Sequence, residues 1–578
     1  MHAAAVQRLV LTTHFRAKQK RCVRRSIADL AGCSFEKPHF KRYSLWPQYR
    51  QESTNANLIN QKTWRGSIME HEAGTGGVEY EKVGADYFAK RTLRKYAGVF
   101  SLWALGVGAV ISGHYSGWNF GLGVGGFGGF LIAAIVIGIM YLCLCYCLAE
   151  MSPALPHTGA AYSFARSAMG PWGGYLTGVA ENIEYVITPA VIVFFIGSYM
   201  SGIFPSTAEY QWVWWIVGYV IFLGLNLLGV ELSFKVSVVV TLLALAVLII
   251  YWISAIPHFD FNRWALNIGV DPATGATVEL PEGNGSFMPL GWAGVLAALP
   301  FAVWLFLAIE QLPLAAEESH DPKRDMPKGL LSGFLTLAIS ATLITFLNSG
   351  IGVQNADGTA HGAFYLGGSA EPLLDGFRVT IPGLAEFLAI CALLGLIASF
   401  HTIIYAMGRQ VYSLSRAGYF PRGLSVTHGT HQVPHKALLI GAVVGFVVMI
   451  VIYRVREDSG AIIGGTLLNM AVFGAMISYF MQGLSFVVLR QKLPHIPRPY
   501  VSPLGVAGGY IVMAISAVTL FMQLQDPVYR NGVYFAAAWY AICIVYFAAI
   551  GRHKLVYSPE EEFATRERQK AVMTKASA

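Results

Sequence analysis

Charged side chains are scarce in this sequence. Asp, Glu, Lys and Arg make up 13% of its 578 residues, whereas 55% of the residues are hydrophobic. A typical soluble domain carries about 25% charged residues, so a water-soluble fold of this length would lack the polar side chains to cover its surface. Apolar runs of about 20 residues, long enough to cross a hydrocarbon core of about 30 Å, recur along the chain. The composition therefore indicates an integral membrane protein.

Three further absences exclude classes of function. The sequence has no G-x-x-x-x-G-K-[ST] loop that could cradle phosphates, so we expect no attached ATPase and a process driven by a gradient. It shows no nucleophile–base spacing and no metal-ligand cluster, so we expect no enzyme, no metal and no cofactor. Cys143, Cys145 and Cys147 alternate along a predicted helix and point about 200° apart, which prevents them from sharing one metal. Nothing indicates a disulfide framework.

Positive charge is concentrated near the N-terminus. The first 68 residues hold 13 of the 41 Lys and Arg residues but three of the 33 acids, which leaves the rest of the chain close to neutral. A basic run at 21–25 could contact nucleic acid or anionic lipid. We expect instead a disordered cytoplasmic tail over residues 1–89 and no nucleic-acid partner. Without an apolar h-region, the tail is no ordinary secretory signal.

Twelve hydrophobic segments follow the tail. They lie at about 98–120, 125–149, 172–204, 211–229, 234–256, 291–313, 329–353, 380–409, 436–454, 461–489, 506–525 and 532–551. Twelve spans place both termini on one side of the membrane. The loops on that side would carry twelve Lys or Arg residues and the opposite loops five, before the basic flanks are counted. By the positive-inside rule, both termini are expected in the cytoplasm, in a bacterial-type inner (plasma) membrane.

These spans define the expected domain organisation. A transporter domain would occupy residues 90–554, followed by a C-terminal cytoplasmic tail at 555–578. The two larger outer loops, 257–290 and 354–379, are rich in Gly, Pro and Asp. They are expected to be caps without a fold of their own.

The first and sixth spans are poor continuous helices. Small residues that disfavour a helix recur in the first span: Gly106, Gly108, Ser112, Gly113 and Gly117. A break near Ala109–Gly113 would free backbone groups at mid-membrane depth and must then line an enclosed cavity; alternatively, these residues only permit close helix packing. Five spans later, Pro300 and Glu310 disturb the sixth span. Interrupted helices at corresponding positions of two five-helix halves point to a transporter's binding site.

Three segments in these spans and loops resemble the amino acid–polyamine–organocation transporters: Ala149–Arg166, Ala315–Pro327 and Arg409–Pro421. The resemblance covers about residues 90–550. It implies an all-α membrane protein with twelve transmembrane helices, a five-plus-five inverted repeat (LeuT-like) with helices 1 and 6 interrupted, and alternating access. The repeats would lie at about 98–256 and 291–489, with extra helices at 506–551.

Within that superfamily, segments 107–119 and Ala180–Pro189 look most like the ethanolamine permease branch. Two positions depart from relatives. Where amino acid carriers often show Gly-[aromatic]-Glu in helix 6, this chain has Ala308-Ile309-Glu310, and where many relatives place a lysine in helix 5 it has Thr241. The unwinding point and the coupling ion, a proton or sodium, therefore stay open.

The third span carries two carboxylates, Glu181 and Glu184, on one helix face with Tyr185 and Thr188. A carboxylate in a membrane span costs at least about 2.5–3.5 kcal/mol, so it is a functional candidate by default. An amine substrate is a cation that needs a counter-charge once it leaves water. Two neighbouring acids also repel each other, so one of them could carry a proton. The alternative is a structural pair satisfied by Asn182, Tyr185 or a basic residue.

The other substrate-site candidates flank the two predicted breaks. By resemblance, Trp304 matches an aromatic residue that closes over the substrate, and its ring face could hold a cation; Phe306 flanks the same break. The remaining candidates are backbone groups of Ala109, Val110, Ile111, Ser112, Gly113 and Leu305. Carbonyls around Ala109–Ile111 and Leu305–Leu307 would accept hydrogen bonds from an ammonium group, whereas the N–H groups of Ser112 and Gly113 would favour a carboxylate.

Tyr185 and four more residues are candidates for coupling or gating. Glu310 could couple charge to transport or act as a structural hydrogen-bond anchor. His114 and His401 could carry protons, although a lone membrane histidine is more often a packing residue. The Ser399 hydroxyl could contribute to a sodium-like site between helices 1 and 8.

Taken together, these features predict a permease that imports a small primary amine, ethanolamine first, across the lipid bilayer. The close alternative is a proton-coupled amino acid permease. A third possibility is a substrate sensor that has the same fold but transports nothing. A large soluble signalling domain would favour a sensor, and the sequence shows none.

The composition of the tail also makes a testable prediction about its origin. Met69 opens a short acidic stretch that leads into the first span, and we expect translation to begin there. N-terminal sequencing of protein expressed from the native gene should therefore start at Met69. Residues found before it would contradict this expectation.

Overall fold

The computed structural model describes residues 77–557 except residues 82, 84–85, 156–158, 355–359 and 456–459. The described residues belong to one compact unit, Met69–Ala578. The basic run at 21–25, the expected start at Met69 and most of the C-terminal tail at 555–578 lie outside the described residues. In the described part of the predicted N-terminal tail, Tyr80 forms a bridge with Leu555, and α4 (Asp86–Ala89) follows.

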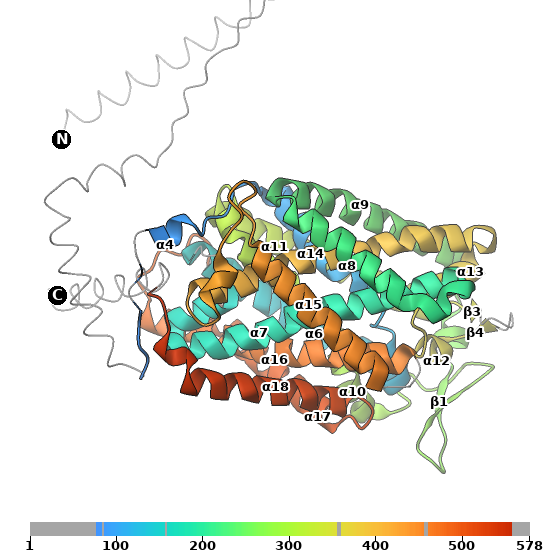
Figure 1. The fold of residues 1–578 in the computed structure, drawn as a ribbon. Helices are drawn as coiled ribbons and strands as arrows, with labels where there is room; N and C mark the ends of the chain where they lie inside the picture. The colour runs from blue at the N-terminus through green and yellow to red at the C-terminus, as the bar shows by residue number, and fades with distance from the viewer. Residues whose placement is uncertain are drawn as a thin grey trace, which may run out of the picture. The chain divides into compact units, whose positions relative to one another are not determined.

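Twelve apolar helices cross this unit (Figure 1). Ten are long: α6 (Phe120–Ala154), α7 (Ala160–Ile203), α8 (Gln211–Leu227), α9 (Val230–Ala255), α11 (Pro322–Ser349), α14 (Ala385–Arg416), α15 (His435–Val455), α16 (Gly460–Lys492), α17 (Gly505–Gln525) and α18 (Arg530–Ala549). The other two, α5 (Val99–Val110) and α10 (Gly291–Val303), are short because their spans are interrupted. The twelve predicted spans correspond to these helices, and the expected all-α membrane fold is confirmed.

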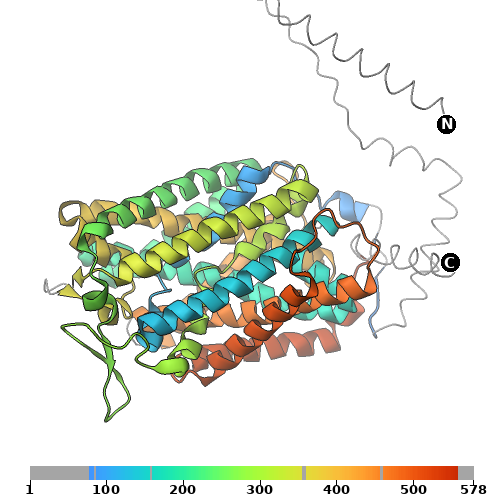
Figure 2. The same cartoon turned by 180° about the vertical axis from the view of Figure 1, so that it is seen from behind.

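Burial separates central from peripheral helices. In the most apolar window of α7, 83% of the residues are buried, against 17% in α18. The helix α16 packs closely on α7, because a side chain at Gly474 would lie 2.5 Å from the carbonyl oxygen of Ala180. The helices α17 and α18 lie at one edge of the array and α9 at the opposite edge (Figures 1 and 2). The central α7 is therefore the helix best placed to carry buried polar groups.

Two of the long helices contain a sharp turn at glycine. Gly126 in α6 has φ 67° and ψ 173°, and Gly170 in α7 has φ 81° and ψ −170°. These conformations favour glycine, and Pro171 then begins the membrane-crossing part of α7. The residues of α6 before Gly126 therefore belong to the end of the first span.

The outer loops have more structure than we expected. The first, at 257–290, contains the π-helical turn η4 (Phe261–Ala265) and an antiparallel hairpin of β1 (Ile268–Val270) and β2 (Thr277–Glu279). The second, at 354–379, contains β4 (Ala360–His361), paired with β3 (Val353–Gln354), then α12 (Ala363–Leu366) and most of α13 (Pro372–Thr380). The loops therefore contain short helices and strands that the expectation of caps without a fold of their own did not include. A high Gly, Pro and Asp content marks turns, but it does not reveal the apolar side chains that α13 buries, Leu373, Leu374 and Phe377.

Six further short helical segments lie between or after the longer helices. They are η2 (Pro205–Tyr210), η3 (Ile256–His258), η5 (Ile309–Glu318), η6 (Pro382–Leu384), η7 (Arg422–Ser425) and η8 (Gly551–His553).

Both predicted helix interruptions are present. The first span leaves α-helical geometry after Val110, passes through the 3₁₀ turn η1 (Ile111–His114), and turns again at Gly117, whose φ is 95°. Ala109 and Val110 are therefore still helical, and the break begins two residues later than the predicted position. The sixth span unwinds after Val303 and resumes at η5, with Ala308 at φ 83°.

Ion pairs anchor each of the three segments that carry the family resemblance, and two of these pairs join the second segment to the third. Glu318 at the end of η5 pairs with Arg409 of α14 at 2.9 Å, and these two side chains are 0% and 1% exposed. Next to it, Glu317 pairs with Arg416 at 2.8 Å. In the first segment, Glu150 of α6 accepts hydrogen bonds from Arg490 of α16. Breaking a fully buried pair such as Glu318–Arg409 costs about 3–5 kcal/mol because it leaves a lone charge, so this pair holds η5 against α14.

The backbone at Ala308 predicts an unusual response to glycine. A non-glycine residue in the left-handed region costs about 1–2 kcal/mol, whereas glycine in a helix interior costs about 1 kcal/mol relative to alanine. Ala302 of α10 and Ala308 are both 0% exposed, so Ala308→Gly and Ala302→Gly lose the same buried methyl group. We expect Ala308→Gly to be more stable than Ala302→Gly by about 2 kcal/mol. Thermal unfolding of both variants in detergent tests this, and equal melting temperatures would contradict it.

Candidate substrate and coupling site

His114 connects the two helix interruptions. Its Nε2 lies 3.0 Å from the carbonyl oxygen of Leu305, and its Nδ1 lies 2.7 Å from the Ser340 hydroxyl of α11. Because a carbonyl can only accept, Nε2 carries the proton and Nδ1 accepts from Ser340 in a neutral ring. The ring therefore satisfies a carbonyl that the unwound sixth span leaves without a helical partner.

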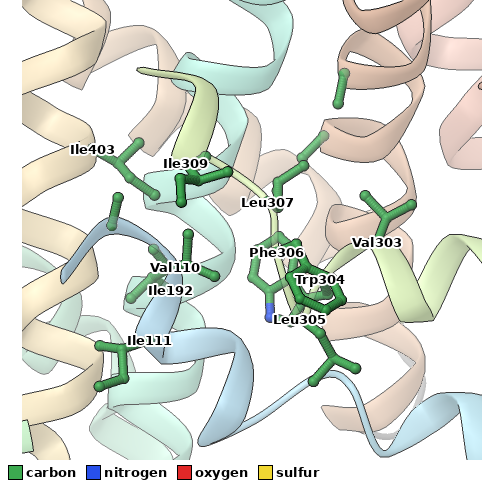
Figure 3. Packing of buried hydrophobic residues seen from close by; sticks show 14 of the residues in the cluster. Val110, Ile111, Ile192, Val303, Trp304, Leu305, Phe306, Leu307, Ile309 and Ile403 are labelled. Atoms are coloured by element: carbon green, nitrogen blue, oxygen red, sulfur yellow. The ribbon is translucent and has the colours of Figure 1, made fainter. Parts of the chain in front are cut away.

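Trp304 packs directly against the first break. Its Nε1 donates to the carbonyl of Ser116 at 3.0 Å. A side chain at Gly113 would lie 2.1 Å from the Trp304 carbonyl oxygen, and one at Gly117 would lie 2.8 Å from the Trp304 ring nitrogen. Figure 3 shows the unwound stretch that carries Trp304 beside Val110 of the first span. Both glycines are therefore needed for the two breaks to touch.

Ser399 joins the first break to α14. The Ser112 N–H donates to the Ser399 hydroxyl at 2.9 Å, and this hydroxyl donates to the Gly108 carbonyl at 2.7 Å. Nearby, the Thr241 hydroxyl donates to the Ala104 carbonyl at 3.1 Å. Hydroxyl and carbonyl oxygens of this kind could hold a hard cation such as sodium, but here the hydroxyls bond within the protein and seal helix 1 against its neighbours.

Three glutamates from two spans meet beside the second break. Tyr185 of α7 lies between Glu181 and Glu310, with its hydroxyl 3.3 Å from one carboxylate and 3.4 Å from the other. Glu181 also accepts from Gln410 of α14 at 2.8 Å, and Glu184 accepts from Tyr479 of α16 at 3.2 Å. All three glutamates are at most 1% exposed. We call Glu181, Glu184 and Glu310 the acid cluster.

The acid cluster has no cationic partner among the described residues. The ion pair of Arg409 of α14 is with Glu318 and not with the cluster. The carboxyl groups of Glu184 and Glu310 contact each other, and each has one oxygen, Oε2, that receives no hydrogen bond from the described residues. Two like charges in such contact cannot both persist, and one shared proton would supply the missing donor. The arrangement can therefore bind either a proton or a cation.

A comparison with known sequences identifies the family to which this chain belongs. The model of the amino acid permease family matches residues 102–559. The chain belongs to the amino acid permease family. It is therefore a multi-pass membrane transporter and not an enzyme, and its fold has the inverted five-helix repeats expected from the resemblance.

Three relatives illustrate the range of this family. An uncharacterized transporter of Rhizobium meliloti (strain 1021) is 27% identical over 71% of this chain and 83% of its own. The branched-chain amino acid permease BcaP of Bacillus subtilis (strain 168) is 23% identical, over 72% of this chain and 85% of its own. The methylthioribose transporter of the same Bacillus strain is 21% identical, over 81% of this chain and 95% of its own.

Two sequence candidates, His401 and Phe306, lie outside the acid cluster. His401 contacts Asn226 of α8 and Ser233 of α9, with its Nδ1 3.1 Å from Asn226 Nδ2 and its Nε2 3.1 Å from the Ser233 hydroxyl. Phe306 stacks on Phe334, with ring centroids 5.8 Å apart, and also contacts Tyr141. Both side chains therefore pack between helices and do not join the acid cluster.

Two hydrogen-bond partners of the acid cluster, Gln410 and Tyr479, were not among our candidates. Gln410 follows Arg409 in a segment that already carried the family resemblance, and Tyr479 is a polar residue within the tenth span. Polar groups in apolar spans are the signal that could have found both. In contrast, Asn182, considered as a partner of the glutamates, leaves its Oδ1 without a hydrogen bond from the described residues.

The contact between the breaks predicts strict size limits at Gly113. The Gly113→Ala variant places a methyl group against the Trp304 backbone, and such overpacking costs about 1–3 kcal/mol. We expect a lower melting temperature and loss of uptake. Gly98→Ala is the matched control, because its new methyl group would meet nothing within 4 Å, and it should behave as the unmodified permease. A Gly113→Ala variant that melts and transports normally would show that the breaks are not in contact.

Proposed function

We propose that this permease moves a small primary amine by alternating access, with ethanolamine as the first candidate substrate. The observation that carries the proposal is the acid cluster: three buried glutamates without a cation. Such an unpaired charge is costly in a membrane and is kept where it binds a substrate or a proton. An ammonium group would supply the positive charge that the described residues do not.

The first break supports an amine that has no carboxylate. An amino acid would need free N–H groups there for its carboxylate. The Ser112 N–H is already bonded to the Ser399 hydroxyl. Binding of a carboxylate at this N–H would have to displace that hydroxyl, whereas an ethanolamine hydroxyl requires no anion site.

A proton-coupled amino acid permease is the second candidate. The family description and the name of the branched-chain amino acid permease favour it, whereas the name of the methylthioribose transporter shows that a relative can carry another substrate. In either case, we propose that the shared proton of Glu184 and Glu310 couples transport to a pH gradient. We further propose a plasma-membrane location with both termini in the cytoplasm, on the strength of the positive-inside pattern.

Uptake of labelled ethanolamine into proteoliposomes distinguishes an amine permease from an amino acid permease. We expect saturable uptake that unlabelled ethanolamine blocks and that alanine, glutamate and arginine do not, with a faster rate under an imposed pH gradient. Uptake of an amino acid instead of ethanolamine would support the second candidate, a proton-coupled amino acid permease. Absence of transport for either class would favour a sensor.

Neutralising the acid cluster should weaken amine transport. Removing one partner of a buried charge pair costs about 2–5 kcal/mol, so we expect Glu181→Gln and Glu184→Gln each to raise KM for the amine at least tenfold, and Glu184→Gln also to lose the response to a pH gradient. Glu386→Gln is the matched control, because Glu386 is exposed at the start of α14. Unchanged affinity and rate in both cluster variants would rule out the proposed role.

A further inference from the structure

A groove with a basic and an apolar wall lies at the beginning of α11. Its volume is about 550 Å³, and it is lined by the three cations Lys323, Arg324 and Lys328 together with Pro327, Leu331 and Val99. In a helix, residues four apart share a face. Lys323, Pro327 and Leu331 therefore form one stripe along α11, and Arg324 and Lys328 lie on the adjacent stripe. The groove changes from charged to apolar along the helix axis.

No described residue forms an ion pair with the three cations. All three are exposed. The two nearest acids in sequence, Asp321 and Asp325, do not line the groove. The Asp325 carboxylate accepts from the Ser319 hydroxyl and the Asp321 N–H. The groove therefore presents three positive charges to its surroundings.

The length of the groove matches an amphipathic ligand. With a rise of about 1.5 Å per residue, Leu331 lies about 12 Å along the axis from Lys323. The apolar end belongs to a membrane-spanning helix, and the charged end lies where that helix begins, on the side predicted to be cytoplasmic. A free phosphate ion could pair with the cations but would leave the apolar wall uncovered. A phospholipid would occupy both the charged end and the apolar end of the groove.

We propose that this groove binds one anionic phospholipid, with its phosphate on Lys323, Arg324 and Lys328 and an acyl chain along Leu331. Basic pockets between membrane helices on the cytoplasmic side recognise such headgroups. The lipid would also contact Val99, the first residue of the interrupted helix α5, and Tyr500 before α17. It would therefore bridge α5, α11 and the connection between α16 and α17.

Native mass spectrometry of the purified, delipidated permease titrated with phosphatidylglycerol tests the proposal. Each basic residue near an anionic lipid changes binding by about fivefold, so Lys323→Gln/Lys328→Gln should weaken the tightest phosphatidylglycerol site about 25-fold. The charge-matched control Lys436→Gln/Lys554→Gln, at two other exposed lysines, should stay within about twofold of the unmodified protein. Lys323→Arg/Lys328→Arg should keep tight binding, because the charge is retained.

Two competitors distinguish the lipid from its headgroup chemistry. Inorganic phosphate should not displace bound phosphatidylglycerol, and phosphatidylcholine should bind more weakly. Equal phosphatidylglycerol affinity in the Lys323→Gln/Lys328→Gln variant and the unmodified protein would overturn the site. Displacement by inorganic phosphate would overturn the lipid as its occupant, and equal affinity for phosphatidylcholine would overturn recognition of the anionic charge.

Discussion

The hydrocarbon core of the membrane imposes the constraint on which this structure depends. Backbone groups freed by a broken helix find no water there, so the protein itself must supply their partners. In the sixth span, the Leu305 carbonyl faces the His114 ring. In the first, the Ser112 N–H donates to Ser399. Each interruption is thus possible only because other helices meet it, and Gly113 allows that approach by leaving room for the Trp304 backbone.

The same constraint divides the buried acids into two kinds. Glu318 is paired with Arg409 and so holds η5 against α14 without a net charge. Glu181, Glu184 and Glu310 have tyrosine and glutamine partners, which donate hydrogen bonds but leave the charge in place. Neutral partners of this kind let a carboxyl group gain and lose a proton or a cation. The charge of the hydrogen-bond partner, rather than burial alone, therefore distinguishes a structural acid from a candidate for coupling.

Sequence reasoning located the spans and both interruptions, because long apolar runs and clustered small residues are local features. It also named the three glutamates, since acids in apolar spans stand out. It could not identify Gln410 and Tyr479 as their partners, because these contacts join α7 to α14 and α16 across more than 200 residues. Nor did it foresee the ordered outer loops, where α13 is stabilised by apolar contacts that turn-forming residues do not reveal. Pairing between distant helices is therefore the part that a single sequence leaves undetermined.

The side chains between the two breaks limit where a substrate can bind and how the permease can move. Val110, Ile192, Ile309 and Ile403 gather there (Figure 3), and all four are at most 1% exposed. These side chains offer a substrate no polar partner, so its polar groups must meet backbone groups at the breaks or the acid cluster. Both nitrogens of His114 are engaged, one with the sixth span and one with Ser340 of α11. The first break, the sixth span and α11 must therefore move as one body, or exchange these hydrogen bonds, whenever the site opens.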